Sequence, residues 1–428
     1  MKRTLAVLTS MALLVVMISG GVGAAPKKQV LRFYYPVGVA GPLAKAVGDL
    51  CDEFNSSQSE VLVDPIYSGG YAETMQRCIT AAKSGNPPDI AVMTGADMWV
   101  SIDADIIIPL QPFIDKSGGD SFISPFYQAF LNDCEISGQI YGIPFQKSTP
   151  IFYYNKDMFR EAGLDPNSGP KDWNELVEYA KKLTVRKGNT VTRWGLEIPV
   201  DQWIYTGMIM QAGGTISNKA GNRIALNTPE GIEALSFMKS LAMDYKVMPS
   251  RRLFGDSSAD FVAGKTAMMY NSTGNLTFVR QNATFDWGVS FLPAGKVRAV
   301  PTGGGHLVVF NGISRERQEA AWKFITWLTS PANAAKWSVA SGYVPVRKDA
   351  FNVAEMKQYV ARYPQALVAR DQLQYARREE PASHEGRQIS QLITVMLESV
   401  LAGNEKLSDA LNGVQNKIDT VLAPFSKK

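Results

Sequence analysis

The composition of this 428-residue chain is that of a folded protein: 45% of the residues are hydrophobic and 20% are charged. That length suits two or three domains of common size and leaves no indication of disorder. The formal net charge is +4, and it falls to +2 when Lys2 and Arg3 are removed. A nearly neutral chain lacks the concentrated basic surface of a general nucleic-acid or anionic-membrane binder, so we expect no nucleic-acid partner.

The first 24 residues have the pattern of a secretory signal peptide. Lys2 and Arg3 precede an apolar run over residues 5–18, and Val22-Gly23-Ala24 is a small-residue cleavage site. No cysteine lies at the cleavage point, which argues against a lipid anchor. The sequence therefore predicts a soluble periplasmic protein, with an uncleaved membrane anchor as the alternative.

The next part of the chain alternates strands with helices. Residues 30–35, 61–67 and 89–93 have the composition of strands, and residues 43–54 and 74–83 lie between them with helical spacing. Alternation of this kind predicts a largely parallel sheet that is covered on both faces.

The middle of the chain is dominated by two short strands, at 143–145 and 151–154, joined by a polar segment that ends in Pro150. A short helix at 158–162 follows, and Gly163 is placed to end it. Further elements are expected as helices at 171–182, 203–212 and 228–244 and as strands at 191–198, 267–270, 286–291 and 303–310. Helices at 318–339 and two apolar stripes, over 389–400 and 411–422, complete the pattern.

Two segments carry a resemblance to a known family. YNKDMFREAGLDP (154–166) is followed by KDWNEL (171–176), and AAWKFITWLTSPANAAKWSVASGYVPVRKDA covers 320–350. These runs resemble the extracellular solute-binding proteins (family 1) of ABC transporters, which include the maltose-, oligosaccharide- and glycerol-3-phosphate-binding proteins. The resemblance extends over nearly the whole mature chain.

The resemblance implies an α/β fold with two lobes, the class II periplasmic binding protein architecture. Each lobe is expected to be a mostly parallel sheet flanked by helices, with the ligand cleft between the lobes. The first lobe would contain residues 25–142 and about 293–341, and the second residues 143–292 and about 342–428. Hinge crossings are expected near 143–154, 292–301 and 342–347.

The function implied by the resemblance is that of the periplasmic binding component of an ABC importer. The expected partners are a small sugar or glycerol-derived ligand and the transmembrane subunits of an ABC permease. We expect a monomer that is not an enzyme and has no catalytic residue, cofactor or metal. A partner of a chemoreceptor is an alternative with the same fold.

Polar and aromatic residues at strand and helix ends form the candidate ligand site, because loops at strand ends carry the ligand groups in open α/β sheets. The candidates are Tyr71, Thr94, Gly95, Ser148, Trp203, Ser272, Gly304, Gly305, His306, Tyr343 and Arg387. In the glycerol-3-phosphate and glycerophosphodiester binders of the family, the positions matching Tyr71, Ser148, Trp203, Ser272, Gly304 and Tyr343 contact ligand.

Three departures from those relatives concern the substrate. The glutamate that holds glycerol hydroxyls aligns with Gly95, and a second stacking tryptophan aligns with about Val200. The arginine that clamps phosphate has no counterpart in register, although Arg387 is near. Loss of that arginine favours a neutral sugar, because an anion is best bound by a bidentate guanidinium. Arg387 and His384 could instead serve an anion that is placed differently.

A secreted hydrolase is the alternative from another class of function. Its candidate base is His306, after Gly303–Gly305, or His384, and these are the two histidines of the chain. Gly264-Lys265-Thr266 is not a phosphate-binding loop, because Ala259 stands where that motif needs glycine.

The three cysteines match no zinc motif. Cys51 and Cys78 lie on the first two predicted helices and could pair in an oxidising compartment, and three buried free thiols, with Cys134, are the alternative.

Overall fold

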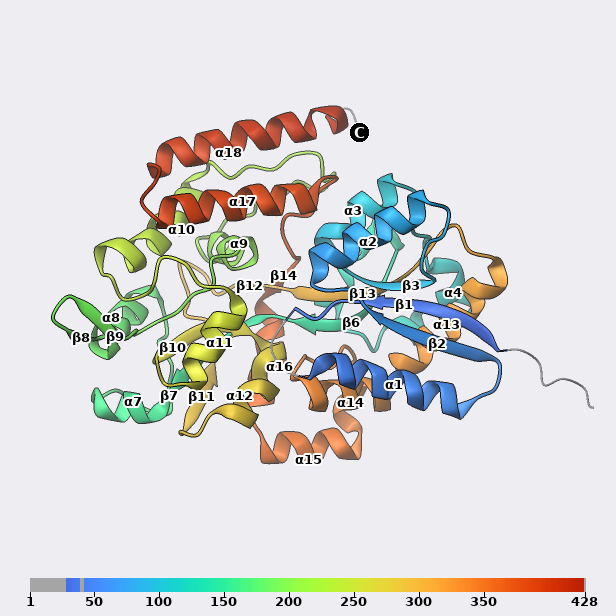
Figure 1. The fold of residues 1–428 in the computed structure, drawn as a ribbon, viewed down its shortest axis with the longest axis horizontal. Helices are drawn as coiled ribbons and strands as arrows, with labels where there is room; N and C mark the ends of the chain where they lie inside the picture. Colours follow the sequence, from blue (N-terminus) through green and yellow to red (C-terminus); the bar gives the residue numbers. More distant parts are fainter. Residues whose placement is uncertain (1–27, 39–41, 427–428) are drawn as a thin grey trace, which may run out of the picture.

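The computed structural model describes residues 28–38 and 42–426, so the predicted signal peptide lies outside the described residues. The chain forms two lobes that lie side by side, each with a sheet covered by helices (Figure 1). The predicted α/β fold with two lobes is therefore confirmed.

The sheet of the first lobe has five strands in the order β2-β1-β3-β13-β6. β1 is parallel to β2 and β3, whereas β13 is antiparallel to both β3 and β6. The strands are β1 (Gln29–Tyr35), β2 (Val61–Tyr67), β3 (Ile90–Thr94), β6 (Ile143–Ser148) and β13 (Gly303–Val309). A separate two-stranded hairpin joins β4 (Glu135–Ile136) to β5 (Gln139–Ile140).

Both faces of this sheet are buried. Along β3, Ile90 and Val92 belong to the larger core on one face, and Ala91 and Met93 belong to the smaller core on the other. A strand with apolar residues on both faces needs a helical layer on each side, as the alternating pattern predicts. The covering helices are α1 (Leu43–Ser57), α2 (Tyr71–Lys83), α3 (Gly95–Asp103), α4 (Gln111–Lys116), α5 (Asp120–Ile123), α6 (Gln128–Leu131) and α13 (Arg315–Leu328).

The second lobe differs from the expectation of a mostly parallel sheet. β10 (Met268–Ser272) and β11 (Trp287–Ser290) both pair antiparallel with the central β7 (Pro150–Asn155). Among the described residues, this three-stranded sheet forms parallel pairs only through single bridges, such as Glu197 with Met269. β10 and β11 lie on either side of β7 and run in the same direction, and a helical segment, Leu276–Asn282, connects them.

The helices of the second lobe enclose a core that includes Phe152 and Tyr154 of β7, while Ile151 and Tyr153 face a smaller core on the opposite side. Its elements are α7 (Lys156–Glu161), α8 (Trp173–Leu183), α9 (Gln202–Gln211), α10 (Pro229–Lys239), a short π-helix (Ser240–Asp244), α11 (Phe254–Val262) and α12 (Leu276–Asn282). β8 (Val185–Lys187) and β9 (Thr190–Arg193) form an exposed hairpin.

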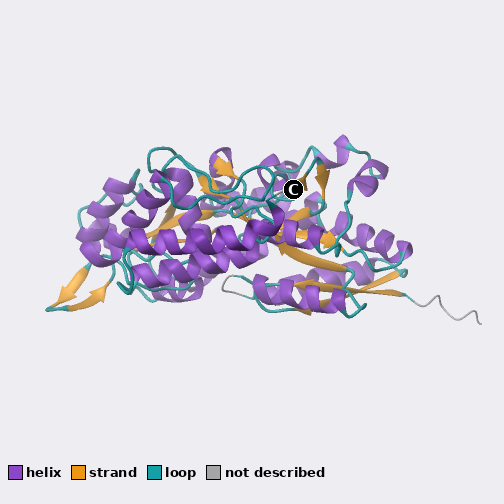
Figure 2. Ribbon diagram, turned by 90° about the horizontal axis from the view of Figure 1, so that it is seen from above, coloured by secondary structure: helices purple, strands orange, loops and turns teal. Residues whose placement is uncertain are grey.

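A pair of long helices, α17 (Gly386–Leu401) and α18 (Leu407–Leu422), lies over the second lobe and reaches the first (Figures 1 and 2). α17 contacts α9 and α10 and also α3 of the first lobe. The two apolar stripes predicted for these helices face the second-lobe core, with Ile393 and Ile418 fully buried.

Residues 343–373 pack in the first lobe, whereas the expected boundary at about 342 assigned them to the second. Tyr343, Val344 and Val346 belong to the first-lobe core, where the ring of Tyr343 stacks on that of Trp337 at 5.8 Å. α14 (Pro331–Ser341) precedes this segment, which contains α15 (Ala354–Arg362) and α16 (Gln365–Gln372). The third crossing to the second lobe comes later, after β14 (Ala376–Arg377), which pairs with β12 (Val300–Pro301).

Two further expectations concern the pairing of the cysteines and the presence of a membrane-spanning helix. All three cysteines are buried free thiols, so the Cys51–Cys78 disulfide is absent and the alternative holds. Within the described part of the chain, no helix combines the length and the apolar character needed to cross a membrane.

Candidate functional site

A cavity of about 210 Å³ lies between the two lobes, where the first lobe, the second lobe and the C-terminal segment meet. It is lined by Gly38, Tyr71, Thr94, Ser148, Asp201, Gln202, Trp203, Phe254, Ser272, Gly303, Gly304, Tyr343, Glu379 and Arg387. Aromatic rings and hydrogen-bonding groups therefore face the same small volume, which is the usual character of a site for a small polar molecule.

Eight of the eleven predicted site residues line this cavity: Tyr71, Thr94, Ser148, Trp203, Ser272, Gly304, Tyr343 and Arg387. Gly95, Gly305 and His306 do not line it. Sequence reasoning missed Gly38, Asp201, Gln202, Phe254, Gly303 and Glu379. Asp201 had a usable signal, because an Asp before an apolar helix is a typical N-cap, and the other five residues had none.

Asp201 and Trp203 are held together at the N-terminus of α9. The carboxylate of Asp201 accepts a hydrogen bond from the backbone N–H of Trp203 at 2.8 Å and caps the helix. The indole N–H of Trp203 donates to the carbonyl of Thr302 at 2.8 Å, which fixes the ring against the strand that returns to the first lobe. Burial raises the pKa of Asp201.

The glycines of the segment 303–305 allow this close packing. A Cβ on Gly303 would lie 2.5 Å from the indole ring of Trp203, so a side chain there would displace the ring from the cavity. Gly304 has a positive φ of +84°, and a Cβ there would lie 1.7 Å from the carbonyl oxygen of Gln146. The run of glycines therefore has a packing role at the cavity wall.

Arg387 enters the cavity from the first turn of α17 and is already paired. Its Nη2 donates to both carboxylate oxygens of Asp97, at 2.7 Å to Oδ1 and 2.8 Å to Oδ2, and its Nε donates to Oδ1 at 2.9 Å. Nη2 also donates to the hydroxyl of Thr94 at 3.0 Å. The fork of an arginine matches a carboxylate in this way, so the pair is strong and directional.

Glu379 occupies the space that a side chain at position 95 would need. Its carboxylate accepts a hydrogen bond from the backbone N–H of Gly95 at 3.1 Å, and the same oxygen would lie 3.1 Å from a Cβ on Gly95. The C-terminal segment thus brings a carboxylate to the loop after β3. Burial raises the pKa of Glu379 to about 8.

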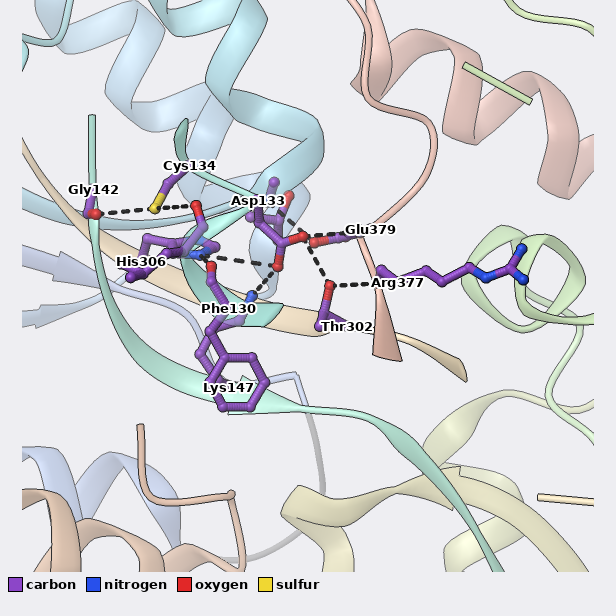
Figure 3. Close-up of polar contacts among 12 residues, drawn as sticks. Phe130, Asp133, Cys134, Gly142, Lys147, Thr302, His306, Arg377 and Glu379 are labelled. Atoms are coloured by element: carbon purple, nitrogen blue, oxygen red, sulfur yellow. Dashed lines mark hydrogen bonds and ion pairs between the residues drawn. The ribbon is translucent and has the colours of Figure 1, made fainter. Parts of the chain in front are cut away.

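Behind the cavity, Asp133 connects the three segments that run between the lobes (Figure 3). It accepts hydrogen bonds from the ammonium of Lys147 at 2.7 Å, from the hydroxyl of Thr302 at 2.8 Å and from the backbone N–H of Glu379 at 2.9 Å. Lys147 belongs to the first crossing, Thr302 to the second and Glu379 to the third.

Gln372 is a second buried side chain that connects the crossings. Its amide nitrogen donates to the carbonyl of Pro150 at 2.8 Å, and its oxygen accepts from the backbone N–H of Leu292 at 2.8 Å. Pro150 begins β7 and Leu292 follows β11, so Gln372 joins the first and second crossings.

Both histidines lie away from the cavity. His306 is fully buried beside Phe130, whose carbonyl accepts its Nε2–H at 3.0 Å, and burial lowers its pKa to about 3 (Figure 3). His384 is packed against the rings of Trp99 and Phe425 and lies 2.5 Å from Asp103. Neither imidazole has the access to solvent and substrate that a hydrolytic base requires.

A family model for bacterial extracellular solute-binding proteins matches residues 49–365, which is most of the chain. The chain belongs to this family. It is therefore a solute-binding component of ABC import and not an enzyme, and the hydrolase alternative is not supported. Among the described residues, no group of three or more His, Cys, Asp or Glu side chains is arranged to hold a metal ion.

Relatives of this solute-binding protein include the sn-glycerol-3-phosphate-binding periplasmic protein UgpB of Salmonella typhimurium. The two are 27% identical over 405 residues, which cover 90% of this chain and 91% of the relative. The crystal structure of UgpB from Mycobacterium tuberculosis in complex with glycerophosphocholine is also 27% identical, with a TM-score of 0.81 and coverage of 93% and 99%. The cyclic alpha-maltosyl-1,6-maltose binding protein of Arthrobacter globiformis shares the fold, at 23% identity, 92% and 99% coverage and a TM-score of 0.76.

Proposed function

We propose that this solute-binding protein works in the periplasm, where it captures a sugar or a glycerol derivative and delivers it to the transmembrane subunits of an ABC permease. The ligand would occupy the cavity between the lobes, with Tyr71, Ser148, Trp203, Ser272, Gly304 and Tyr343 among its contacts. Movement of the lobes about the three crossings would bury it. No chemical step is involved, because capture needs only a higher affinity for the closed state.

The observation that carries this proposal is the chemistry of the cavity wall. Rings from Tyr71, Trp203, Phe254 and Tyr343 line the same volume as the hydroxyls of Ser148 and Ser272 and two carboxyl groups. Flat aromatic faces suit the C–H surface of a sugar or polyol, and hydroxyl and carboxylate oxygens suit its O–H groups.

The location and assembly are parts of the same proposal. Export through a signal peptide at residues 1–24 would place the mature chain in the periplasm, where the curated relatives work. We expect a monomer without a nucleic-acid partner, because the mature chain is nearly neutral and the cavity is completed by one chain.

The test is a binding survey of the mature protein, residues 25–428, by thermal shift and then by calorimetry. The panel holds maltose, trehalose, glycerol-3-phosphate and glycerophosphocholine, with an amino acid as a control outside the class. A ligand at about 100 times its Kd stabilises a protein by about 2.7 kcal/mol, which is a shift of a few degrees in Tm. The proposal would be overturned if the amino acid stabilised the protein and none of the sugars or glycerol derivatives did.

A further inference from the structure

The cation that lines the cavity is not free to bind an anion. Arg387 supplies the positive charge among the lining residues, and three of its donor contacts end on Asp97. Asp97 is 1% exposed, so its charge acts on Arg387 with little screening by water. The positive charge that a phosphate would need is therefore already neutralised.

Asp97 is itself held in place from a second direction. Its Oδ2 accepts a hydrogen bond from the backbone N–H of Thr94 at 3.0 Å, which belongs to the capping box of α3, and a second from the hydroxyl of Thr94 at 2.8 Å. Rotation of Asp97 away from Arg387 would break this cap as well as the ion pair. The carboxylate is thus built into the fold and does not yield readily to an incoming anion.

The other ionisable side chains that line the cavity are carboxyl groups, which supply no positive charge. Asp201 and Glu379 line it, and neither forms an ion pair among the interactions of the described residues. Lys147 lies behind the wall, but its ammonium is fully buried on Asp133. A phosphate dianion in this volume would therefore find no unpaired cation among the lining residues.

We propose that Asp97 determines the selectivity of this protein by occupying Arg387, so that the cavity accepts uncharged, hydroxyl-rich ligands and rejects phosphate monoesters. This inference rests on the proposed function, because it selects among sugars and glycerol derivatives. Asp201 and Glu379 then serve as partners for ligand hydroxyls, and the part of the guanidinium that does not face Asp97 donates to ligand oxygens. Asp97 is a positioning residue, since it acts through Arg387.

The experiment compares the wild-type protein with the Asp97→Asn variant by calorimetry, using maltose, trehalose, glycerol and glycerol-3-phosphate. The wild-type protein should bind at least one neutral probe at least 100-fold more tightly than glycerol-3-phosphate. Asp97→Asn keeps a side-chain oxygen that can accept from Thr94, but it removes the negative charge that neutralises Arg387. The variant should therefore bind glycerol-3-phosphate at least tenfold more tightly. A merely structural role of Asp97 would not produce a gain of phosphate affinity.

The matched control is Asp89→Asn. Asp89 is a fully buried carboxylate that accepts two hydrogen bonds from Arg317, both at 2.6 Å, in the same lobe but away from the cavity. The Asp89→Asn substitution should lower stability without changing the preference between neutral and phosphorylated probes. If Asp97→Asn fails to fold, the wild-type selectivity alone decides the proposal.

The outcomes separate this inference from the proposed function. Tight binding of glycerol-3-phosphate by the wild-type protein, with weaker binding of every neutral probe, would overturn the inference and leave the function standing. No gain of phosphate affinity in a folded Asp97→Asn protein would overturn the role of Asp97. Binding of no sugar or glycerol derivative at all would overturn both.

Discussion

The ammonium of Lys147 lies 2.7 Å from the carboxylate of Asp133, and neither side chain is exposed to solvent. A buried ion pair is weak grounds for stability in general, because desolvation of the two charges opposes their attraction. Its position here suggests a different role. Asp133 also bonds to Thr302 and to the backbone of Glu379, so one carboxylate sets the relative position of the three crossings.

Asp133→Asn should therefore lower the free energy of unfolding by about 3 kcal/mol, because removal of one partner leaves the buried ammonium of Lys147 without its counter-charge. Urea unfolding of the purified variant checks this value. The control is Asp49→Asn, which breaks the exposed pair of Asp49 with Lys45 and should change stability by less than about 0.5 kcal/mol. Equal effects of the two substitutions would contradict the role assigned to Asp133.

Trp203→Ala should weaken binding of the best ligand about 30-fold, which corresponds to about 2 kcal/mol, because it removes an aromatic wall of the cavity. Calorimetry measures the change. Trp173→Phe is the comparison: Trp173 stacks on Phe237 at 4.3 Å within the second-lobe core and does not line the cavity. It should reduce stability and leave the affinity within about twofold. If Trp203→Ala keeps full affinity, the cavity does not hold the ligand.

Gly304→Ala should destabilise the protein by about 2–5 kcal/mol. The left-handed backbone costs a residue with a Cβ about 1–2 kcal/mol, and the clash with the Gln146 carbonyl adds to it. Gly264→Ala separates the two effects, because Gly264 also has a positive φ, +69°, but the nearest atom to its Cβ would be 3.6 Å away. That control should cost only about 1–2 kcal/mol. Thermal unfolding of both variants gives the comparison.

The sequence predicted the elements near the first hinge better than the division into lobes. The strands at 143–145 and 151–154 correspond to β6 and β7, because local composition and a Pro-ended polar segment determine them. The segment 343–373 was expected in the second lobe. Its helices have apolar faces that suit either core, and only the tertiary packing of residues such as Tyr343 assigns them to the first lobe.

The site was predictable where a residue ends a strand or begins a helix, as Thr94 and Trp203 do. Glu379 was missed because its place beside Gly95 depends on a contact between residues 284 positions apart. The resemblance directed attention to position 95, which does not line the cavity, and a glycine in the sequence gives no indication of which distant side chain fills its space.

The thiols of Cys51, Cys78 and Cys134 should be unreactive in the native protein. All three are buried, and burial raises the pKa of each, so the nucleophilic thiolate is scarce and shielded. Titration with a disulfide reagent should find about three thiols in urea and almost none without it. Fewer thiols in urea without a reductant would show that two of them had formed a disulfide, contrary to the structure.

The stability of the protein should fall as the pH rises from about 4.5 to about 8. Over this range the carboxyl of Glu379 keeps its proton in the folded protein, since burial raises its pKa from 4.5 to about 8, whereas the unfolded chain has lost that proton. The folded state then binds more protons, so each pH unit costs on the order of 1 kcal/mol per such group, and the dependence ends above about 8.

Glu197 contributes with the same sign, because burial raises its pKa to about 8 as well. Glu379→Gln should therefore make the slope of unfolding free energy against pH less negative by on the order of 1 kcal/mol per unit, and Glu197→Gln should do the same. The double variant should flatten the slope further than either change alone, since the two carboxyls lie in different parts of the structure. Urea unfolding at pH 5, 6, 7 and 8 measures these slopes, and a wild-type stability that rises over this range would contradict the protonated state of both groups.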